Sequence, residues 1–152
     1  MPTASGGPTA DAWKGRWHIP LPPNKRDTIL IVDDDCEASE RWAKGLQSCS
    51  PQYTVLTTER VQSALDVCRC EKLACVVLDL DMNHESGFEI LIDLVPDRQH
   101  PEIAIVVLTR LISTTVHQIA LEYGAHAVLV KHRTSPQLLN KAIQTAIASV
   151  VA

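Results

Sequence analysis

The chain has 152 residues, of which 45% are hydrophobic and 21% are charged, which is ordinary for one globular domain. The formal charge of −4 gives no electrostatic reason to expect nucleic acid as a partner. No apolar run reaches the roughly 18 residues of a membrane span. The N-terminus also lacks the basic and apolar regions of a secretory signal. We therefore expect a cytoplasmic protein with neither nucleic-acid nor membrane partners.

Residues 1–27 differ in composition from the rest of the chain. They contain five of the nine prolines, together with Gly6 and Gly7, and show no apolar periodicity. This composition predicts a flexible arm rich in proline and glycine, followed by one domain over residues 28–152. Trp13 and Trp17 are unusual in such an arm. They favour either a tail laid loosely on the domain or a docking segment for a partner.

From Thr28 onward, short apolar runs alternate with segments of helical period. In chain order, the pattern predicts strand 29–32, helix 37–48, strand 53–57, helix 61–70, strand 76–81, helix 88–94, strand 103–108, helix 114–123, strand 127–130 and helix 135–150. Near-continuous apolar strands that alternate with helices indicate an α/β fold with a parallel sheet covered on both faces. Right-handed crossovers then give a doubly wound sandwich.

The third predicted strand is the most informative segment. It begins as the apolar run Val76–Leu78 and ends in two carboxylates, Asp79 and Asp81. Because side chains alternate across a strand, we expect both carboxylates to start on the same face of the sheet.

Polar side chains follow four of the five predicted strands. Asp33 and Asp34 come after the first, Asp79 after the third, Thr109 after the fourth and Lys131 after the fifth. In a parallel sheet these ends lie along one edge, which is the usual place for ligand chemistry in open α/β folds. We therefore expect an acidic cluster, a hydroxyl group and an ammonium group to converge there.

This combination favours phosphoryl chemistry. Clustered carboxylates repel one another until a cation arrives, and oxygen ligands suit Mg²⁺, which pairs with phosphate. A carboxylate such as Asp79 can act as a nucleophile toward phosphorus. Lys131 would then neutralise charge on the phosphoryl oxygens, and Thr109 would donate a hydrogen bond to one of them.

The chain resembles the receiver domains of two-component response regulators, over residues of about 28 to 148. The matching segments are Ile29-Leu30-Ile31-Val32-Asp33-Asp34-Asp35, Val77-Leu78-Asp79-Leu80-Asp81, Ser86-Gly87-Phe88-Glu89, Val106-Val107-Leu108-Thr109 and Val128-Leu129-Val130-Lys131. The resemblance implies a flavodoxin-like (βα)5 sheet of strand order 2-1-3-4-5. It also implies a phosphoprotein in a two-component phosphorelay, signalling through protein–protein contacts rather than turning over an external substrate as an enzyme.

The resemblance further implies a role for each site residue. Asp79 would accept a phosphoryl group from a histidine kinase or a phosphotransfer protein. Asp33, Asp34, Asp79 and the backbone carbonyl of Asp81 would hold Mg²⁺. Thr109 and Lys131 would contact the phosphoryl group.

The chain departs from the family pattern at four positions. His132 stands where proline usually follows the lysine, and Asn83 where a proline is common. Arg110 replaces a usually small residue after the threonine, and Val128 replaces an aromatic switch residue. We expect Arg110 to overhang the phosphorylation site or to pair with Glu85, and His132 to allow an ordinary trans bond, so that both are possible modulators of the phosphoryl lifetime.

Two other interpretations remain. A receiver-like interaction module that is never phosphorylated is compatible with the departures from the family pattern. A phosphohydrolase of the haloacid-dehalogenase type is less compatible, because those enzymes place an acidic pair after the lysine and no Asp or Glu follows Lys131. The end of the chain just after the last predicted helix would suit a stand-alone, CheY-like receiver.

Overall fold

The computed structural model describes residues 27–83, 85–95 and 103–151. The predicted N-terminal arm up to residue 26, with Trp13 and Trp17, lies outside the described residues. The predicted boundary between arm and domain therefore stays a prediction.

A five-stranded parallel sheet forms the middle of the domain, with the order β2-β1-β3-β6-β7. Its strands are β1 (Thr28–Val32), β2 (Thr54–Thr58), β3 (Cys75–Leu78), β6 (Ala104–Thr109) and β7 (Ala127–Val130). Counting only the strands of this sheet, the order is 2-1-3-4-5, so the predicted doubly wound topology is confirmed. The inner strands β1, β3 and β6 are buried almost throughout, as their continuous apolar sequences predict.

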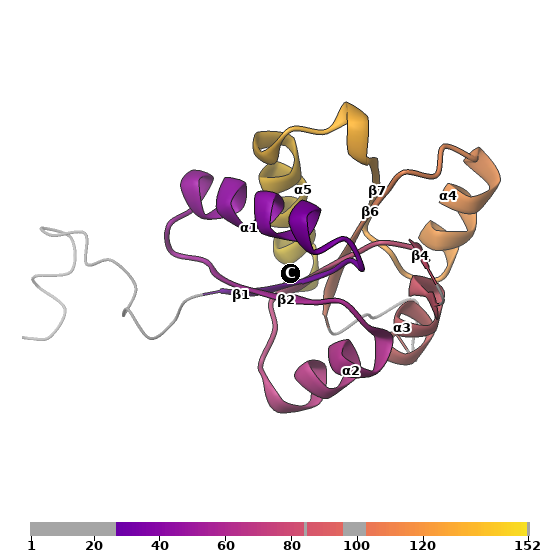
Figure 1. Ribbon diagram of the computed structural model, residues 1–152, viewed down its shortest axis with the longest axis horizontal. Helices are drawn as coiled ribbons and strands as arrows, with labels where there is room; N and C mark the ends of the chain where they lie inside the picture. The colour runs from indigo at the N-terminus through magenta and orange to yellow at the C-terminus, as the bar shows by residue number, and fades with distance from the viewer. Residues whose placement is uncertain (1–26, 84, 96–102, 152) are drawn as a thin grey trace, which may run out of the picture.

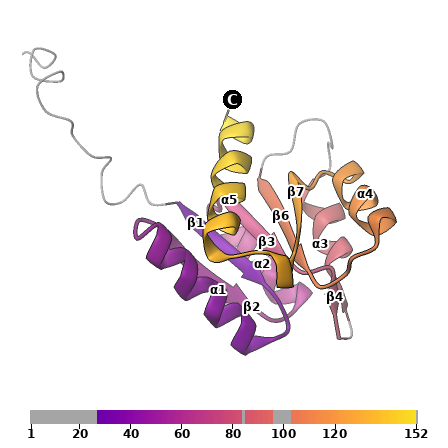
Figure 2. The same cartoon turned by 90° about the horizontal axis from the view of Figure 1, so that it is seen from above.

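Helices cover both faces of this sheet (Figure 1). Their bounds are α1 (Cys36–Cys49), α2 (Val61–Cys70), α3 (Gly87–Leu94), α4 (Thr114–Glu122) and α5 (Pro136–Val151). Side chains of α1 and α5 pack on one face with Ile29 and Ile31, whereas α2, α3 and α4 pack on the other with Leu30 and Val32. Figure 2 shows the same layers from above, with α1 and α5 next to each other. Alternation along β1 thus divides the interior into two apolar clusters.

Short polar side chains begin four of the helices. The carboxylate of Asp35 accepts a hydrogen bond from the Ala38 N–H at 3.1 Å, and the hydroxyl groups of Ser86, Ser113 and Ser135 cap α3, α4 and α5 in the same way. Gly124 follows α4 with φ of 114°, a backbone conformation that favours glycine and ends that helix. Capping therefore explains why the chain leaves the carboxyl ends of the strands and enters helices within a few residues.

The segment after β3 differs from the prediction. The sheet strand ends at Leu78, and the chain then forms a small antiparallel pair, β4 (Asp81–Met82) and β5 (Glu85–Ser86), before α3. Asp79 is buried whereas Asp81 is exposed. The expectation that the two carboxylates share a face was wrong, because strand alternation stops before Asp79.

In the part of the chain that the structure describes, none of the helices combines the length and the apolar character needed to cross a membrane.

Candidate functional site

The four predicted strand ends lie along one edge of the sheet. Asp33 follows β1 and Asp79 follows β3, and these neighbouring strands bring the two carboxylates side by side. Thr109 closes β6 and pairs with Val130, the residue before Lys131, on the neighbouring strand β7. Parallel pairing therefore gathers groups that are as far as 98 positions apart in the sequence.

Lys131 joins the two buried carboxylates. Its Nζ donates hydrogen bonds to Asp33 Oδ2 at 2.6 Å and to Asp79 Oδ2 at 3.1 Å. The side chains of Asp33 and Asp79 are only 4% and 2% exposed, so water screens these ion pairs weakly. The predicted convergence of the acidic group and the ammonium group is present.

Burial and charge act in opposite directions on these groups. Burial raises the pKa of Asp79, although the backbone N–H of Asp81 and the charge of Lys131 oppose the rise. Burial lowers the pKa of Lys131, but the hydrogen bond to Asp33 and the charges of Asp79 and Asp33 outweigh it and leave this pKa above its ordinary value. Lys131 is therefore firmly charged, while Asp79 is a more basic carboxylate than one in water.

Asp34 completes an oxygen-rich cluster. One carboxylate oxygen from each of Asp33, Asp34 and Asp79 lies within 4.8 Å of the other two. Asp34 Oδ2 also accepts a hydrogen bond from the backbone N–H of Asn83 at 2.5 Å, which ties the β4–β5 segment to the end of β1. Three carboxylates with one ammonium neighbour leave excess negative charge. This donor set fits a hard divalent cation such as Mg²⁺.

Thr109 is fully buried, and its hydroxyl group faces the loop that follows β6. Its Oγ1 accepts a hydrogen bond from the backbone N–H of Leu111 at 3.2 Å. The carbonyl group of Leu111 in turn accepts from His117 Nε2 on α4 at 2.7 Å. Sequence reasoning missed His117, because a histidine on an amphipathic helix carries no local signal for a loop contact. Thr109 and His117 together hold both polar groups of Leu111.

Arg110 and His132 are exposed at the edges of the site. The pairing of Arg110 with Glu85, one of the two predicted arrangements, is not found. Glu85 instead pairs with Arg60, and the two side chains approach to 3.8 Å. Glu85 Oε1 also accepts a hydrogen bond from the Val61 N–H at 3.1 Å. The N-terminus of α2 has no capping side chain of its own, which explains why it takes Glu85. The described residues contain no cis peptide bond, so His132 follows Lys131 through a trans bond, as expected.

The sequence of the domain matches a family model over residues 29–144, and that model describes the response regulator receiver domain. The chain belongs to this family. Receiver domains of two-component systems share the flavodoxin-like fold, which agrees with the sheet order found here.

Relatives include a probable transcriptional regulator, ycf27, of Porphyra purpurea, which is 32% identical over 124 residues. The match covers 82% of this chain and 49% of the regulator, so the chain spans about half the length of that curated relative. Among solved structures, the BeF3-activated N-terminal receiver domain of Klebsiella pneumoniae RstA is 29% identical with a TM-score of 0.69, covering 80% of this chain and 98% of its own.

A response regulator of Burkholderia pseudomallei, solved with a phosphorylated aspartic acid, calcium ion and citrate, is 26% identical with a TM-score of 0.68. That match covers 82% of this chain and 71% of the Burkholderia chain. The receiver family thus supplies the context in which the cluster of Asp33, Asp34, Asp79 and Lys131 is interpreted.

Proposed function

We propose that this receiver domain accepts a phosphoryl group on Asp79 from a phosphohistidine of a histidine kinase or a phosphotransfer protein. The observation that carries the proposal is the Asp79 carboxylate, held 3.1 Å from Lys131 Nζ beside two further aspartates. The phosphorylated aspartic acid in the Burkholderia relative agrees with this chemistry.

The transfer needs a nucleophile and a way to hold negative charge. An Asp79 oxygen would form the new P–O bond while the P–N bond of the phosphohistidine breaks, and the electron pair would leave on the imidazole nitrogen. Lys131 would move from the two carboxylates toward the incoming phosphoryl oxygens, since its ammonium group already lies beside the acceptor. Thr109 would donate its hydroxyl hydrogen to one phosphoryl oxygen, while its Oγ1 accepts from the Leu111 N–H.

Asp33, Asp34 and Asp79 would hold Mg²⁺, with the backbone carbonyl of Asp81 as a further ligand. When bound, the cation would neutralise charge on the phosphoryl oxygens. The response would pass to partners through protein contacts, and we expect no turnover of an external substrate. Arg110 and His132 remain predicted modulators of the phosphoryl lifetime.

Phosphorylation by acetyl phosphate with Mg²⁺, followed by intact mass, tests the acceptor. The wild type should gain one phosphoryl group, and Asp79→Asn should gain none because the amide is not a nucleophile. Asp93→Asn serves as the matched control, since Asp93 is exposed on α3 and should leave labelling unchanged. An unlabelled wild type would favour the unphosphorylated interaction module, and full labelling of Asp79→Asn would exclude Asp79 as the acceptor.

The metal site has a separate prediction. Asp34→Asn removes one of the clustered carboxylates, so Mg²⁺ should bind at least about tenfold more weakly, as expected for loss of a charged ligand. The metal-free variant should be no less stable than the wild type, because the amide oxygen can still accept from Asn83 while the repulsion falls. Calorimetric titration with Mg²⁺ and thermal unfolding without it measure the two effects. Undiminished affinity would show that Asp34 is not a ligand.

A further inference from the structure

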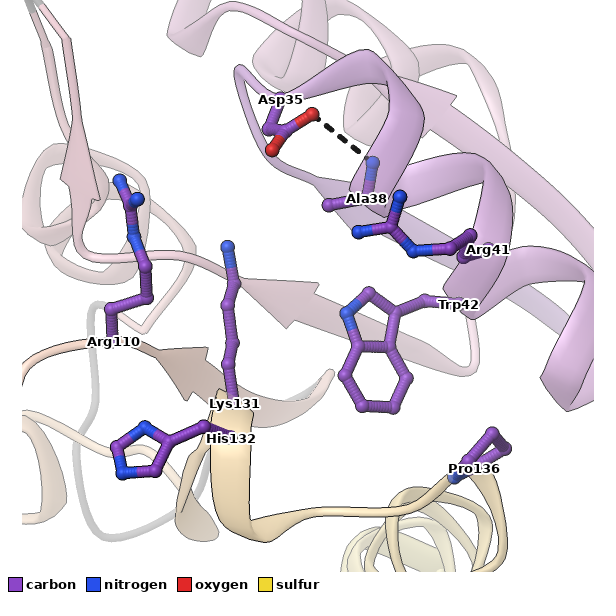
Figure 3. A pocket seen from close by; sticks show the side chains of 8 residues that line it. All are labelled: Asp35, Ala38, Arg41, Trp42, Arg110, Lys131, His132 and Pro136. Atoms are coloured by element: carbon purple, nitrogen blue, oxygen red, sulfur yellow. Dashed lines mark hydrogen bonds between the residues drawn. The ribbon is translucent and has the colours of Figure 1, made fainter.

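A pocket of about 550 Å³ opens beside the acceptor site, between α1 and the segment that joins β7 to α5. We call it the Trp42 pocket, and Figure 3 shows the side chains that line it. Arg41 and Trp42 enter from α1, while Arg110 and Lys131 stand across from them. Its volume lies within the range of roughly 300–1,000 Å³ that is typical of small-molecule sites.

Trp42 gives the pocket a flat apolar wall. The indole packs in part against the core cluster of α1 and α5, which fixes it, and another part of it faces the pocket. Ala38 and Pro136 extend the apolar lining. Pro136 packs closely on Gly45 of α1: a Cβ atom added to Gly45 would lie 2.7 Å from the proline ring. The wall is thus a rigid, largely preformed surface that suits a planar ring.

The charged groups around this wall differ in whether they have hydrogen-bond or ion-pair partners among the described residues. The Asp35 carboxylate caps α1, and Lys131 is engaged by Asp33 and Asp79. By contrast, neither Arg41 nor Arg110 forms a hydrogen bond or ion pair with any residue in the described ranges 27–83, 85–95 and 103–151. Two guanidinium groups that lack partners among the described residues therefore border an aromatic wall. A guanidinium group matches a carboxylate or phosphate in a bidentate manner.

We propose that the Trp42 pocket binds a small planar aromatic anion, whose ring stacks on Trp42 and whose anionic group is held by Arg110 across the pocket. A ligand with both features would cover the indole and would pair with a guanidinium group that has no partner within residues 27–83, 85–95 and 103–151. A neutral aromatic ring would leave the guanidinium groups without a partner, and a non-aromatic anion would leave the indole uncovered. The pocket shares Lys131 with the acceptor site, but its recognition groups are distinct from Asp79.

Calorimetric titration of the full chain with naphthoate tests this inference. Naphthoate should bind, whereas its uncharged amide and cyclohexanecarboxylate should each bind roughly tenfold more weakly, because each lacks one of the two recognised features. Arg110→Ala should weaken naphthoate binding about tenfold as well. Arg133→Ala is the matched control, because Arg133 is an exposed arginine two residues after Lys131 and is not among the residues that line the pocket.

Trp42→Phe keeps an aromatic wall, so it should retain more affinity for naphthoate than Trp42→Leu does. Asp79→Asn should bind naphthoate at least as tightly as the wild type, since the ligand does not contact the acceptor and the loss of the Asp79 charge leaves Lys131 less neutralised beside the pocket. That variant separates the two hypotheses, because it abolishes phosphorylation while leaving the pocket in place. Absence of naphthoate binding at millimolar concentrations, or equal binding by Arg110→Ala and Arg133→Ala, would overturn the inference and leave the proposed function untouched.

Discussion

His126 shows how one side chain links stability to pH. Its Nδ1 accepts a hydrogen bond from the backbone N–H of Ile105 at 3.1 Å. The backbone N–H of His126 donates to the Ile105 carbonyl at 2.7 Å, so the residue joins β6 to the start of β7. Burial lowers the pKa of His126 below its ordinary value of 6.5. A protonated imidazole also has no nitrogen left to accept the bond.

The direction of the pH effect follows from this lowered pKa. Below about pH 6.5 the unfolded chain takes up the proton and the folded chain resists it, so the free energy of unfolding falls as the pH decreases. The decrease in the free energy of unfolding between about pH 7.5 and pH 5.5 should be smaller in His126→Asn than in the wild type, because the amide keeps an acceptor but does not titrate. Urea unfolding at the two pH values measures it, with the exposed His132→Asn as control. Parallel losses in the wild type and His126→Asn would contradict the assignment.

Single residues also mark where sequence reasoning succeeds. Asp33, Asp79 and Lys131 were predictable, because parallel pairing fixes which strand ends meet. The position of Arg110 was not, since an exposed side chain can pair with several neighbours and Glu85 instead satisfies the free N-terminus of α2. Trp42 lies in the predicted helix 37–48 and packs on the core, but only the fold shows that it also lines a pocket.

At the scale of elements, the junction between β5 and α3 packs closely against the backbone of the acceptor residue, Asp79. A Cβ atom added to Gly87 would collide with the backbone carbonyl oxygen of Asp79. Gly87→Ala should therefore lower the free energy of unfolding by roughly 1–3 kcal/mol through overpacking. It should also slow phosphorylation, because the Asp79 backbone must shift. Chemical unfolding and the acetyl phosphate labelling rate measure the two effects.

Ser48→Ala is the control for Gly87→Ala, since Ser48 is exposed on α1 and its replacement should change stability by less than about 0.5 kcal/mol. Equal stability of the two variants would show that the junction relaxes without cost. The junction itself was not predicted: β4 and β5 are two residues long each, and so short a pair has no periodicity to detect. The other long apolar strands and helices were placed to within one or two residues of their observed ends, whereas the predicted strand 76–81 ends three residues earlier, at Leu78.

At the scale of the whole molecule, the sheet lies between two apolar clusters and contributes side chains to both. Alternate residues of β1, β3 and β6 enter the cluster under α1 and α5 or the cluster under α2, α3 and α4. The same strands carry Asp33, Asp79 and Thr109 at their ends. The geometry of the site therefore depends on both layers.

This arrangement predicts one cooperative unfolding transition. Ile90 of α3 and Ile143 of α5 are fully buried in opposite layers, so replacing either with alanine should lower the free energy of unfolding by about 2–5 kcal/mol. Both variants should still unfold in a single step, because losing one layer exposes strands that the other layer needs. Urea unfolding followed by tryptophan fluorescence and by far-ultraviolet circular dichroism checks this. Ile112→Ala is the control, since Ile112 is 62% exposed. If fluorescence and circular dichroism gave different unfolding midpoints in only one of the two variants, the layers would fold independently.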